Sequence, residues 1–307
     1  EACAQVRATA PALTEEPLRD GPAEWASAVK AWHARAERPA APSARFGVEQ
    51  ALAALIAGRR GTSLAEVLLG EVVAEAPRPA VALNALLMGA PDALRAEAER
   101  VQTAGYRAAK LKVGRRALKE EARLVRALHA QWGDAVAIRL DANRAWTWDE
   151  ARAFAEALGG VPIEYIEEPL ADPAKLPDLA AATGLPIALD ESIQDGTVQA
   201  LADHRYACAA VLKPMLTGGL RAAQQWAADA ERLGMTPVLS ASYESGVGMQ
   251  ALVALAATLS AGDVPVGLDT YRRLASDVLA PRLSIGGATV CMRDVLDPRH
   301  TLRPNAL

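Results

Sequence analysis

The segment Val136-Ala-Ile-Arg139-Leu-Asp141-Ala-Asn143 is a short, largely apolar run that ends in charged and polar residues. The same design recurs along the chain, and helix-like segments rich in Ala, Arg and Glu separate the runs. The runs cover residues 81–88, 108–113, 136–141, 163–167, 187–190, 209–213, 237–240 and 264–268. Near-continuous apolar runs indicate strands that are covered on both faces, as in parallel sheets. Because eight such strands alternating with helices close into a barrel, we predict an α/β fold of the TIM-like (β/α)8 type.

The first quarter of the chain has a different pattern of apolar residues from the rest. Periodic apolar segments near residues 25–36, 46–57 and 64–69 are separated by breaks rich in Pro and Gly, which is typical of short helices. We therefore predict a small, mainly helical domain over residues 1–79. The barrel domain then covers residues 80–307, with a C-terminal segment that returns toward the first domain.

The overall composition narrows the class of function. The chain has 307 residues, of which 51% are hydrophobic, and its 33 Lys and Arg against 37 Asp and Glu give a net charge of −4. This charge provides no broad positive field for a phosphate backbone, so we expect no nucleic-acid partner. The longest apolar stretches, such as residues 80–88, are much shorter than the roughly 20 residues that cross a bilayer, so we expect no membrane partner.

The cysteines and the first residues bear on the cellular location. Cys3, Cys208 and Cys291 are far apart and odd in number, which predicts neither a disulfide framework nor a zinc site and fits a cytoplasmic protein. The first residues lack a basic segment followed by an apolar one, so we expect no signal peptide. Because the chain begins with Glu1 and not Met, we also expect some sequence to precede it.

Ionisable or hydroxyl residues stand at the C-terminal ends of the predicted strands. They are Lys112, Asp141, Glu167, Asp190, Lys213 and Ser240, at intervals of 29, 26, 23, 23 and 27 residues. This interval suits one strand, one helix and two short loops, so each residue returns to the same rim of the barrel, where active sites of this fold lie. Residues two apart in a strand share a face, so Lys110 points the same way as Lys112, and Arg139 and Asn143 the same way as Asp141.

Three carboxylates from consecutive strands would then converge on one point. A single acidic residue at a strand end is more often a helix N-cap or a surface charge, but the ordered set favours a shared site. Asp141, Glu167 and Asp190 would repel one another unless a cation lay between them, and an oxygen-only set of ligands suits Mg²⁺. Lys112 and Lys213 would flank this metal from opposite sides, where one of them can act as a general base.

This order of motifs resembles the muconate-lactonizing subgroup of the enolase superfamily. The matching motifs, which span residues 80–270, are Lys110-Leu-Lys112, Asp141-Ala-Asn143, Glu167-Glu-Pro169, Asp190-Glu-Ser192 and Lys213-Pro214. Within the subgroup, residues 139–146, 189–192, 212–218, 240–245 and 267–270 are similar to the o-succinylbenzoate synthase family. Mandelate-racemase-like relatives use a His base instead, and the four histidines here lie in predicted helical or terminal segments.

The resemblance implies a magnesium-dependent lyase of menaquinone biosynthesis. Its substrate would be a small carboxylate, a succinyl-hydroxy-cyclohexadiene carboxylate, and syn elimination of water would yield o-succinylbenzoate. Mg²⁺ would bind the ring carboxylate, Lys112 would act as base and then as acid, and Lys213 would stabilise the anionic intermediate as a cation. Ser240 and Gly267 are the candidates for the succinyl end. The other candidate substrate-binding residues are Lys110, Arg139 and Asn143.

Two other functions stay open at this point. Lys112 facing Lys213 is also the two-base geometry of an N-acylamino acid racemase or another relative in the subgroup. A dipeptide epimerase is disfavoured, because Gly267-Leu-Asp269-Thr270 lacks the Asp-x-Asp that holds an amino group in those enzymes. The non-enzymatic alternative is a metal-binding barrel that serves as an inactive scaffold.

The resemblance also implies a capping domain that starts with antiparallel strands and a mobile loop. No such strands are evident in residues 1–22, so we expect an incomplete N-terminal α+β capping domain. Either the chain is a fragment, or this variant has lost part of its lid. The oligomeric state, monomer or homo-oligomer, does not follow from the sequence.

Overall fold

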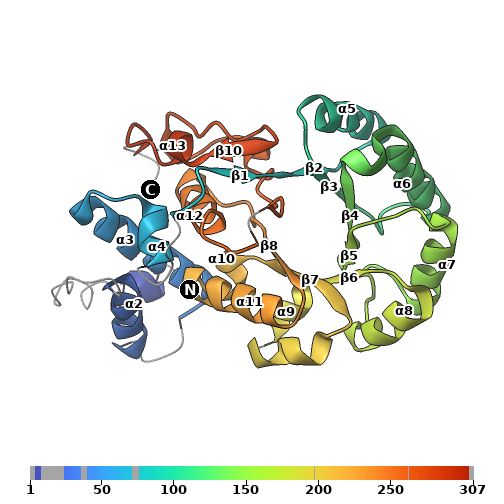
Figure 1. The fold of residues 1–307 in the computed structure, drawn as a ribbon, viewed down its shortest axis with the longest axis horizontal. Coiled ribbons are helices and arrows are strands. Elements are labelled where there is room, and N and C mark those ends of the chain that lie inside the picture. The colour runs from blue at the N-terminus through green and yellow to red at the C-terminus, as the bar shows by residue number, and fades with distance from the viewer. Residues whose placement is uncertain are drawn as a thin grey trace.

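Parallel strands form the centre of the molecule. The computed structural model describes residues 4–7, 24–35, 40–70, 76–196, 198–261 and 263–303. A seven-stranded sheet runs in the order β2-β3-β4-β5-β6-β7-β8, with every neighbouring pair parallel (Figure 1). Its strands are β2 (Asn84–Leu87), β3 (Ala108–Lys112), β4 (Ala137–Asp141), β5 (Tyr165–Glu167), β6 (Ile187–Leu189), β7 (Ala207–Leu212) and β8 (Thr236–Leu239). Sequence order and spatial order agree, as expected when each helix carries the chain to the adjacent strand.

Two residues, Val266 and Gly267, close this sheet into a barrel. Gly267 forms a parallel bridge with Ser240 after β8, and Val266 forms one with Leu83 before β2. The Asn84 amide donates to the Val266 carbonyl at 2.8 Å, and the Gly267 amide donates to the Leu239 carbonyl at 2.8 Å. The predicted barrel is thus confirmed, with its eighth strand reduced to bridge positions.

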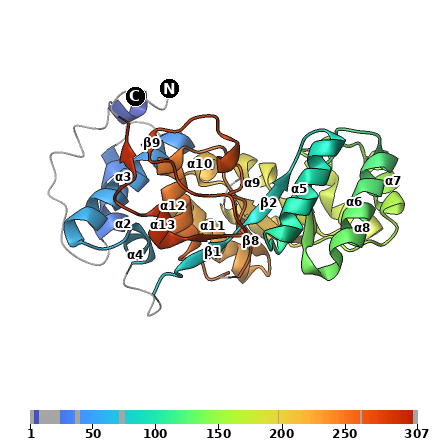
Figure 2. The ribbon, with the colours of Figure 1, turned by 90° about the horizontal axis from the view of Figure 1, so that it is seen from above.

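The helices after each strand cover the outside of the barrel (Figures 1 and 2). They are α5 (Pro91–Thr103), α6 (Leu118–Trp132), α7 (Trp148–Leu158), α8 (Leu176–Thr183), α9 (Glu191–Asp195), α10 (Pro214–Thr217), α11 (Leu220–Arg232) and α12 (Gly246–Ala256). In α11, Leu220, Ala223, Ala227 and Ala230 are buried at intervals of three and four residues, so one face packs inward. Helix α7 begins with a capping box between Thr147 and Glu150.

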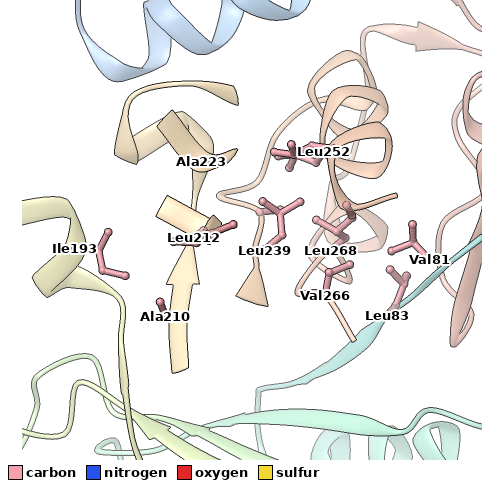
Figure 3. Close-up of a cluster of buried hydrophobic side chains, with 14 of the residues drawn as sticks. Val81, Leu83, Ile193, Ala210, Leu212, Ala223, Leu239, Leu252, Val266 and Leu268 are labelled. Atoms are coloured by element: carbon pink, nitrogen blue, oxygen red, sulfur yellow. The ribbon is translucent and has the colours of Figure 1, made fainter. Parts of the chain in front are cut away.

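Apolar side chains fill two separate layers. Between the strands and their covering helices, Leu212, Leu239, Val266 and Leu268 are buried in one large cluster that also includes Leu252 of α12 (Figure 3). Inside the barrel, a second and smaller cluster occupies the interior beneath the strand ends. It consists of Tyr165, Ala188, Ala209, Val211 and Val238. The barrel is therefore a packed core with room for a site only at its rim.

The N-terminal helices and the C-terminal segment lie at one end of the molecule, away from α6 to α8 (Figures 1 and 2). The helices are α2 (Glu24–Arg35), α3 (Pro42–Arg60) and α4 (Leu64–Leu69). The run predicted over residues 81–88 splits at Leu83, because β1 (Ala80–Ala82) leaves the barrel and pairs antiparallel with β10 (Thr289–Cys291). Beyond β10 come α13 (Met292–Val295) and β11 (Thr301–Leu302), which pairs with β9 (Leu279–Ala280).

The described residues bear on three further expectations from the sequence, namely the N-terminal strands, the cysteines and membrane-spanning helices. The absence of strands from residues 1–22 lies outside the described residues, apart from residues 4–7, which are helical. Cys3 also lies outside them, whereas Cys208 and Cys291 are free thiols. Among the described residues, none of the helices combines the length and apolar character that crossing a bilayer requires.

Candidate active site

The C-terminal ends of the barrel strands place the predicted residues at one rim. Lys112 of β3 is in register with Asp141 of β4, which is in register with Glu167 of β5. Asp190 directly follows β6 and stands at the N-cap position of α9, and Lys213 directly follows β7 and stands at the N-cap position of α10. Residues in register on parallel strands lie at the same height, so Lys112, Asp141 and Glu167 share one level, and Asp190 and Lys213 stand further along toward the C-terminal ends of their strands.

The structure brings the three carboxylates together. Each of Asp141, Glu167 and Asp190 offers an oxygen within 4.8 Å of the other two, and all three residues are 0% exposed. Among the described residues, Glu167 Oε1 has no hydrogen-bond partner although it is buried. Because buried carboxylate oxygens rarely lack a partner, an unpaired oxygen in a cluster of this size fits a site for a hard divalent cation.

Three lysines surround these carboxylates. Lys112 Nζ donates to Asp141 Oδ2 at 2.7 Å, and Lys110 Nζ lies 3.1 Å from Glu167 Oε2 and 3.5 Å from Asp141 Oδ2. Lys213 Nζ donates to Asp190 Oδ2 from the far side. Lys112 and Lys213 therefore lie on opposite sides of the carboxylates.

The carboxylates differ in how tightly they hold a proton. Burial, opposed by Lys110 and reinforced by the other two carboxylates, raises the pKa of Glu167 to about 8. Burial also acts to raise the pKa of Asp141, but Lys110 and Lys112 outweigh it and hold this pKa below its usual value. For Lys110, burial acts to lower the pKa, and Glu167 and Asp141 raise it above the usual value. Lys110 is thus a fixed cation, whose charge lowers the cost of gathering the carboxylates.

A cavity of about 350 Å³ opens above this charged floor. Its lining comprises Asn84, Leu86, Met88, Lys110, Lys112, Arg115, Asp141, Lys213, Ser240, Ala241, Ser242, Tyr243, Gly267, Asp269 and Thr270. Six of the predicted site residues are in this set, while Glu167 and Asp190 lie buried beneath it. At Gly267, an added Cβ atom would lie 2.6 Å from Ser240 Oγ, so glycine keeps this wall of the cavity open.

Arg139 and Asn143 are placed differently from the rest. Arg139 does not line the cavity, because it precedes Asp141 by two residues and points into the barrel one layer deeper. There it is 0% exposed, donates to Glu164 and to the Pro265 carbonyl, and lies over the Tyr165 ring. Asn143 lies just outside the cavity, where its Oδ1 accepts from Lys112 Nζ at 2.6 Å. Asn143 can therefore orient Lys112, whereas Arg139 supports the barrel interior.

Several cavity residues on loops were not predicted as site residues from the sequence, and Arg115 and Tyr243 are two of them. Arg115 follows β3, and the buried Glu121 carboxylate holds its loop by accepting from the amides of Gly114, Arg115 and Arg116 at 2.8, 2.9 and 3.0 Å. Tyr243 has a positive φ of 65° and is 50% exposed at the mouth of the cavity. The position of Arg115, three residues after the Lys-x-Lys strand, was the available signal, and no periodicity marks Tyr243.

Asp269 also lines the cavity, but its charge is already compensated. Its carboxylate accepts from the Leu86 amide at 3.0 Å, from Arg100 at 2.8 Å and from Arg272 at 3.0 Å. These bonds tie the segment after the eighth strand position to β2 and α5. Asp269 therefore supports the cavity wall, and its negative charge is already paired with Arg100 and Arg272.

The sequence of this chain is similar to a protein family and to several known proteins. Residues 93–294 match the family model described as enolase C-terminal domain-like. The chain is 34% identical over 268 residues to the protein PHYLLO, chloroplastic, of Arabidopsis thaliana, and 36% identical over 199 residues to the o-succinylbenzoate synthase of Yersinia pseudotuberculosis. These alignments cover 80% and 64% of this chain, and they span only 16% and 60% of the relatives' lengths.

A solved structure agrees with these matches. The muconate lactonizing enzyme of Pseudomonas fluorescens, complexed with muconolactone, aligns with a TM-score of 0.77 at 25% sequence identity. This alignment covers 98% of the present chain and 82% of the enzyme. The similarity therefore extends over both the barrel and the helices that precede it.

Proposed function

This chain belongs to the enolase superfamily, and from that premise we propose that it is a magnesium-dependent lyase with o-succinylbenzoate synthase activity. The observation that carries the proposal is the pair Lys112 and Lys213 on opposite sides of three buried carboxylates, beneath a cavity at the barrel rim. The relatives named o-succinylbenzoate synthase support this member of the superfamily. The substrate would be a succinyl-hydroxy-cyclohexadiene carboxylate, and the product would enter menaquinone biosynthesis.

Asp141, Glu167 and Asp190 are the residues that would hold Mg²⁺. When bound there, the ion would supply a Lewis acid for the substrate's ring carboxylate, which makes the neighbouring carbon more acidic. The three residues fit this role because they are buried oxygen donors within 4.8 Å of one another, and because Glu167 Oε1 lacks a hydrogen-bond partner among the described residues.

Lys112 is the proposed proton-transferring residue. As the free amine, its Nζ would take the proton from the carbon next to the ring carboxylate, and that C–H bond would break. The resulting ammonium would return the same proton to the hydroxyl that leaves when the C–O bond breaks, so the products are water and an aromatic ring. Asn143 Oδ1, at 2.6 Å from Nζ, would keep the amine directed at the reacting carbon.

Lys213 would act as a cation on the other face of the ring, where it would stabilise the negative charge that develops after proton removal. Ser240, Gly267 and Arg115 would contact the succinyl arm, because they line the cavity beside the lysines. Arg115 is the proposed partner of the distal carboxylate, since its backbone is fixed by Glu121 and the residue lines the cavity.

The same geometry favours one alternative, an N-acylamino acid racemase in which Lys112 and Lys213 both transfer protons. The two functions differ in the substrate that is turned over. The experiment that distinguishes them compares kcat/KM for the cyclohexadiene substrate with kcat/KM for N-succinyl amino acids, both measured with Mg²⁺. A preference for the cyclohexadiene supports the lyase, and a preference for the amino acids overturns it in favour of the racemase. Negligible turnover of both indicates a scaffold.

A further inference from the structure

Glu49, on the N-terminal helix α3, lies against the barrel segment that follows Lys213. Its side chain is 0% exposed, and its Oε2 accepts from the amide of Arg221 at 3.0 Å. The amide of Leu220 also donates to this carboxyl. Glu49 thus caps the N-terminus of α11 from a different part of the chain, where unpaired amides favour an acidic partner.

The turn that Glu49 faces consists of Gly218 and Gly219. Both have positive φ, 111° and 103°, and an added Cβ on Gly219 would lie 2.5 Å from Glu49 Oε2. An added Cβ on Gly218 would lie 3.7 Å from the guanidinium of Arg45, one helical turn before Glu49. The close approach of α3 therefore explains the glycine at position 219, and the positive φ explains the glycine at position 218.

This turn is joined rigidly to Lys213. The Lys213 carbonyl accepts from the amides of Leu216 and Thr217 at 2.8 and 2.9 Å, and from Thr217 Oγ1 at 3.0 Å. At the other end of α10, the Gly219 amide donates to the Pro214 carbonyl at 2.8 Å. The seven residues 213–219 thus form one hydrogen-bonded unit with Lys213 at its start and the Glu49 contact at its end. A shift of the turn would move the Lys213 backbone with it.

We infer that Glu49 is a positioning residue that sets the place of Lys213 beside Asp190 by fixing the start of α11. It acts through the Gly218-Gly219 turn and α10, and it makes the N-terminal helices part of the site although none of their residues lines the cavity. The inference rests on the proposed function only where turnover is concerned, because the position of Lys213 can be measured without a substrate.

The test compares three variants with the wild-type protein. Glu49→Ala removes the cap, and Glu49→Gln keeps an acceptor oxygen in the same place. Glu24→Ala is the matched control, because Glu24 is also a buried acid of the N-terminal helices, yet its ion pairs among the described residues are with Arg59 and Arg60 on α3. Should Glu49→Ala fail to fold, Glu49→Asp, which withdraws the carboxylate by one methylene, takes its place.

The first readout is NMR of the protein labelled with ¹³C at lysine Cε. The chain has only six lysines, so the Lys213 signal can be assigned by its loss in Lys213→Arg. We expect the Lys213 signal to move in Glu49→Ala, to stay near its wild-type position in Glu49→Gln and to be unchanged in Glu24→Ala. An unmoved signal in Glu49→Ala, or an equal shift in Glu24→Ala, overturns the inference whatever reaction the protein catalyses.

The second readout is turnover of the substrate identified under the proposed function. We expect Glu49→Ala to lower kcat by about 10-fold or more with little change in KM, because misplacing a group near the chemistry costs rate more than ground-state binding. Glu49→Gln should restore most of kcat, and Glu24→Ala should lower thermal stability without lowering kcat. A rise in KM at unchanged kcat contradicts the assigned role of Glu49.

Discussion

Replacing Gly219 with alanine should cost far more than an ordinary glycine substitution. The φ of 103° and ψ of −174° at Gly219 belong to a backbone region that is almost restricted to glycine, and holding another residue there costs about 1–3 kcal/mol. The new Cβ would also lie 2.5 Å from Glu49 Oε2 and 2.8 Å from Glu49 Cδ. The carboxyl must then move and release the Arg221 amide, which at a pH above 7, where the carboxyl is ionised, costs about 1.5–3 kcal/mol for a hydrogen bond to a charged group. We expect a total loss of roughly 2.5–6 kcal/mol.

Two comparisons separate these contributions. Gly234, at the other end of α11, has a φ of 81° and nothing within 4 Å of an added Cβ, so Gly234→Ala should show backbone strain alone. In a Glu49→Ala background the clash at Gly219 disappears, and Gly219→Ala should cost only its strain. The double-mutant cycle should therefore give a coupling of about 1.5–3 kcal/mol between Gly219 and Glu49.

Guanidinium unfolding followed by tryptophan fluorescence measures these differences as shifts of the midpoint at constant slope. The reasoning is refuted by a coupling near zero, that is, by a Gly219→Ala cost that is the same with and without the Glu49 carboxyl. A Gly219→Ala cost no larger than that of Gly234→Ala would refute it independently.

Three further predictions concern the metal site, the base and the N-terminal helices. Asp190→Asn should weaken Mg²⁺ binding in calorimetry, because one of three charged oxygen donors becomes a neutral amide; unchanged affinity would remove the proposed ligand set. Lys112→Ala should lower dehydration by about 100-fold or more and abolish exchange of the substrate's α proton in D₂O, and the roles of the lysines are reversed if only Lys213→Ala stops exchange. Burial raises the pKa of Glu49 from 4.5 to about 7, so the folded state holds this proton more tightly and the free energy of unfolding should fall as pH rises from 4.5 to about 7. Urea unfolding should give a flatter pH dependence for Glu49→Gln over this range, and an identical dependence would contradict the assignment.

The barrel could be predicted because its signal is repeated. Each of the eight apolar runs coincides with a strand or, at residues 266–267, with bridge positions, and the spacing of the charged residues placed their strand ends on one rim. The split at Leu83 could not be predicted, since β1 owes its separate identity to pairing with β10, about 200 residues away. The residues near β1 do not reveal that the strand pairs with a segment so far away in the sequence.

The sequence also did not predict how deep a side chain lies inside the barrel or how the loops at its rim are shaped. The period of two assigns Arg139 to the same face as Asp141, but it does not say that Arg139 lies one layer lower, against Tyr165. Arg115 and Tyr243 lie on loops, where no periodicity applies. Glu49 did leave a signal, because it interrupts the apolar stripe of α3 that contains Phe46, Ala53 and Ile56, all of them buried. A buried acid in such a stripe needs a hydrogen-bond donor, and only the structure shows that the donor is an amide at the start of α11.

Closure of the barrel through Val266 and Gly267 gives the ring one thin seam. Neighbouring strands elsewhere are joined over two to five paired residues, whereas the seam is held by a single bridge on each side. Amide hydrogens at this seam should therefore exchange with solvent through local opening sooner than those of β3 and β4. Because Ser240 and Gly267 also line the cavity, a molecule bound there would bridge the seam from within. Slowed exchange of the Gly267 and Ala241 amides, whose hydrogen bonds cross the seam, would then report occupancy of the cavity without any label on the ligand.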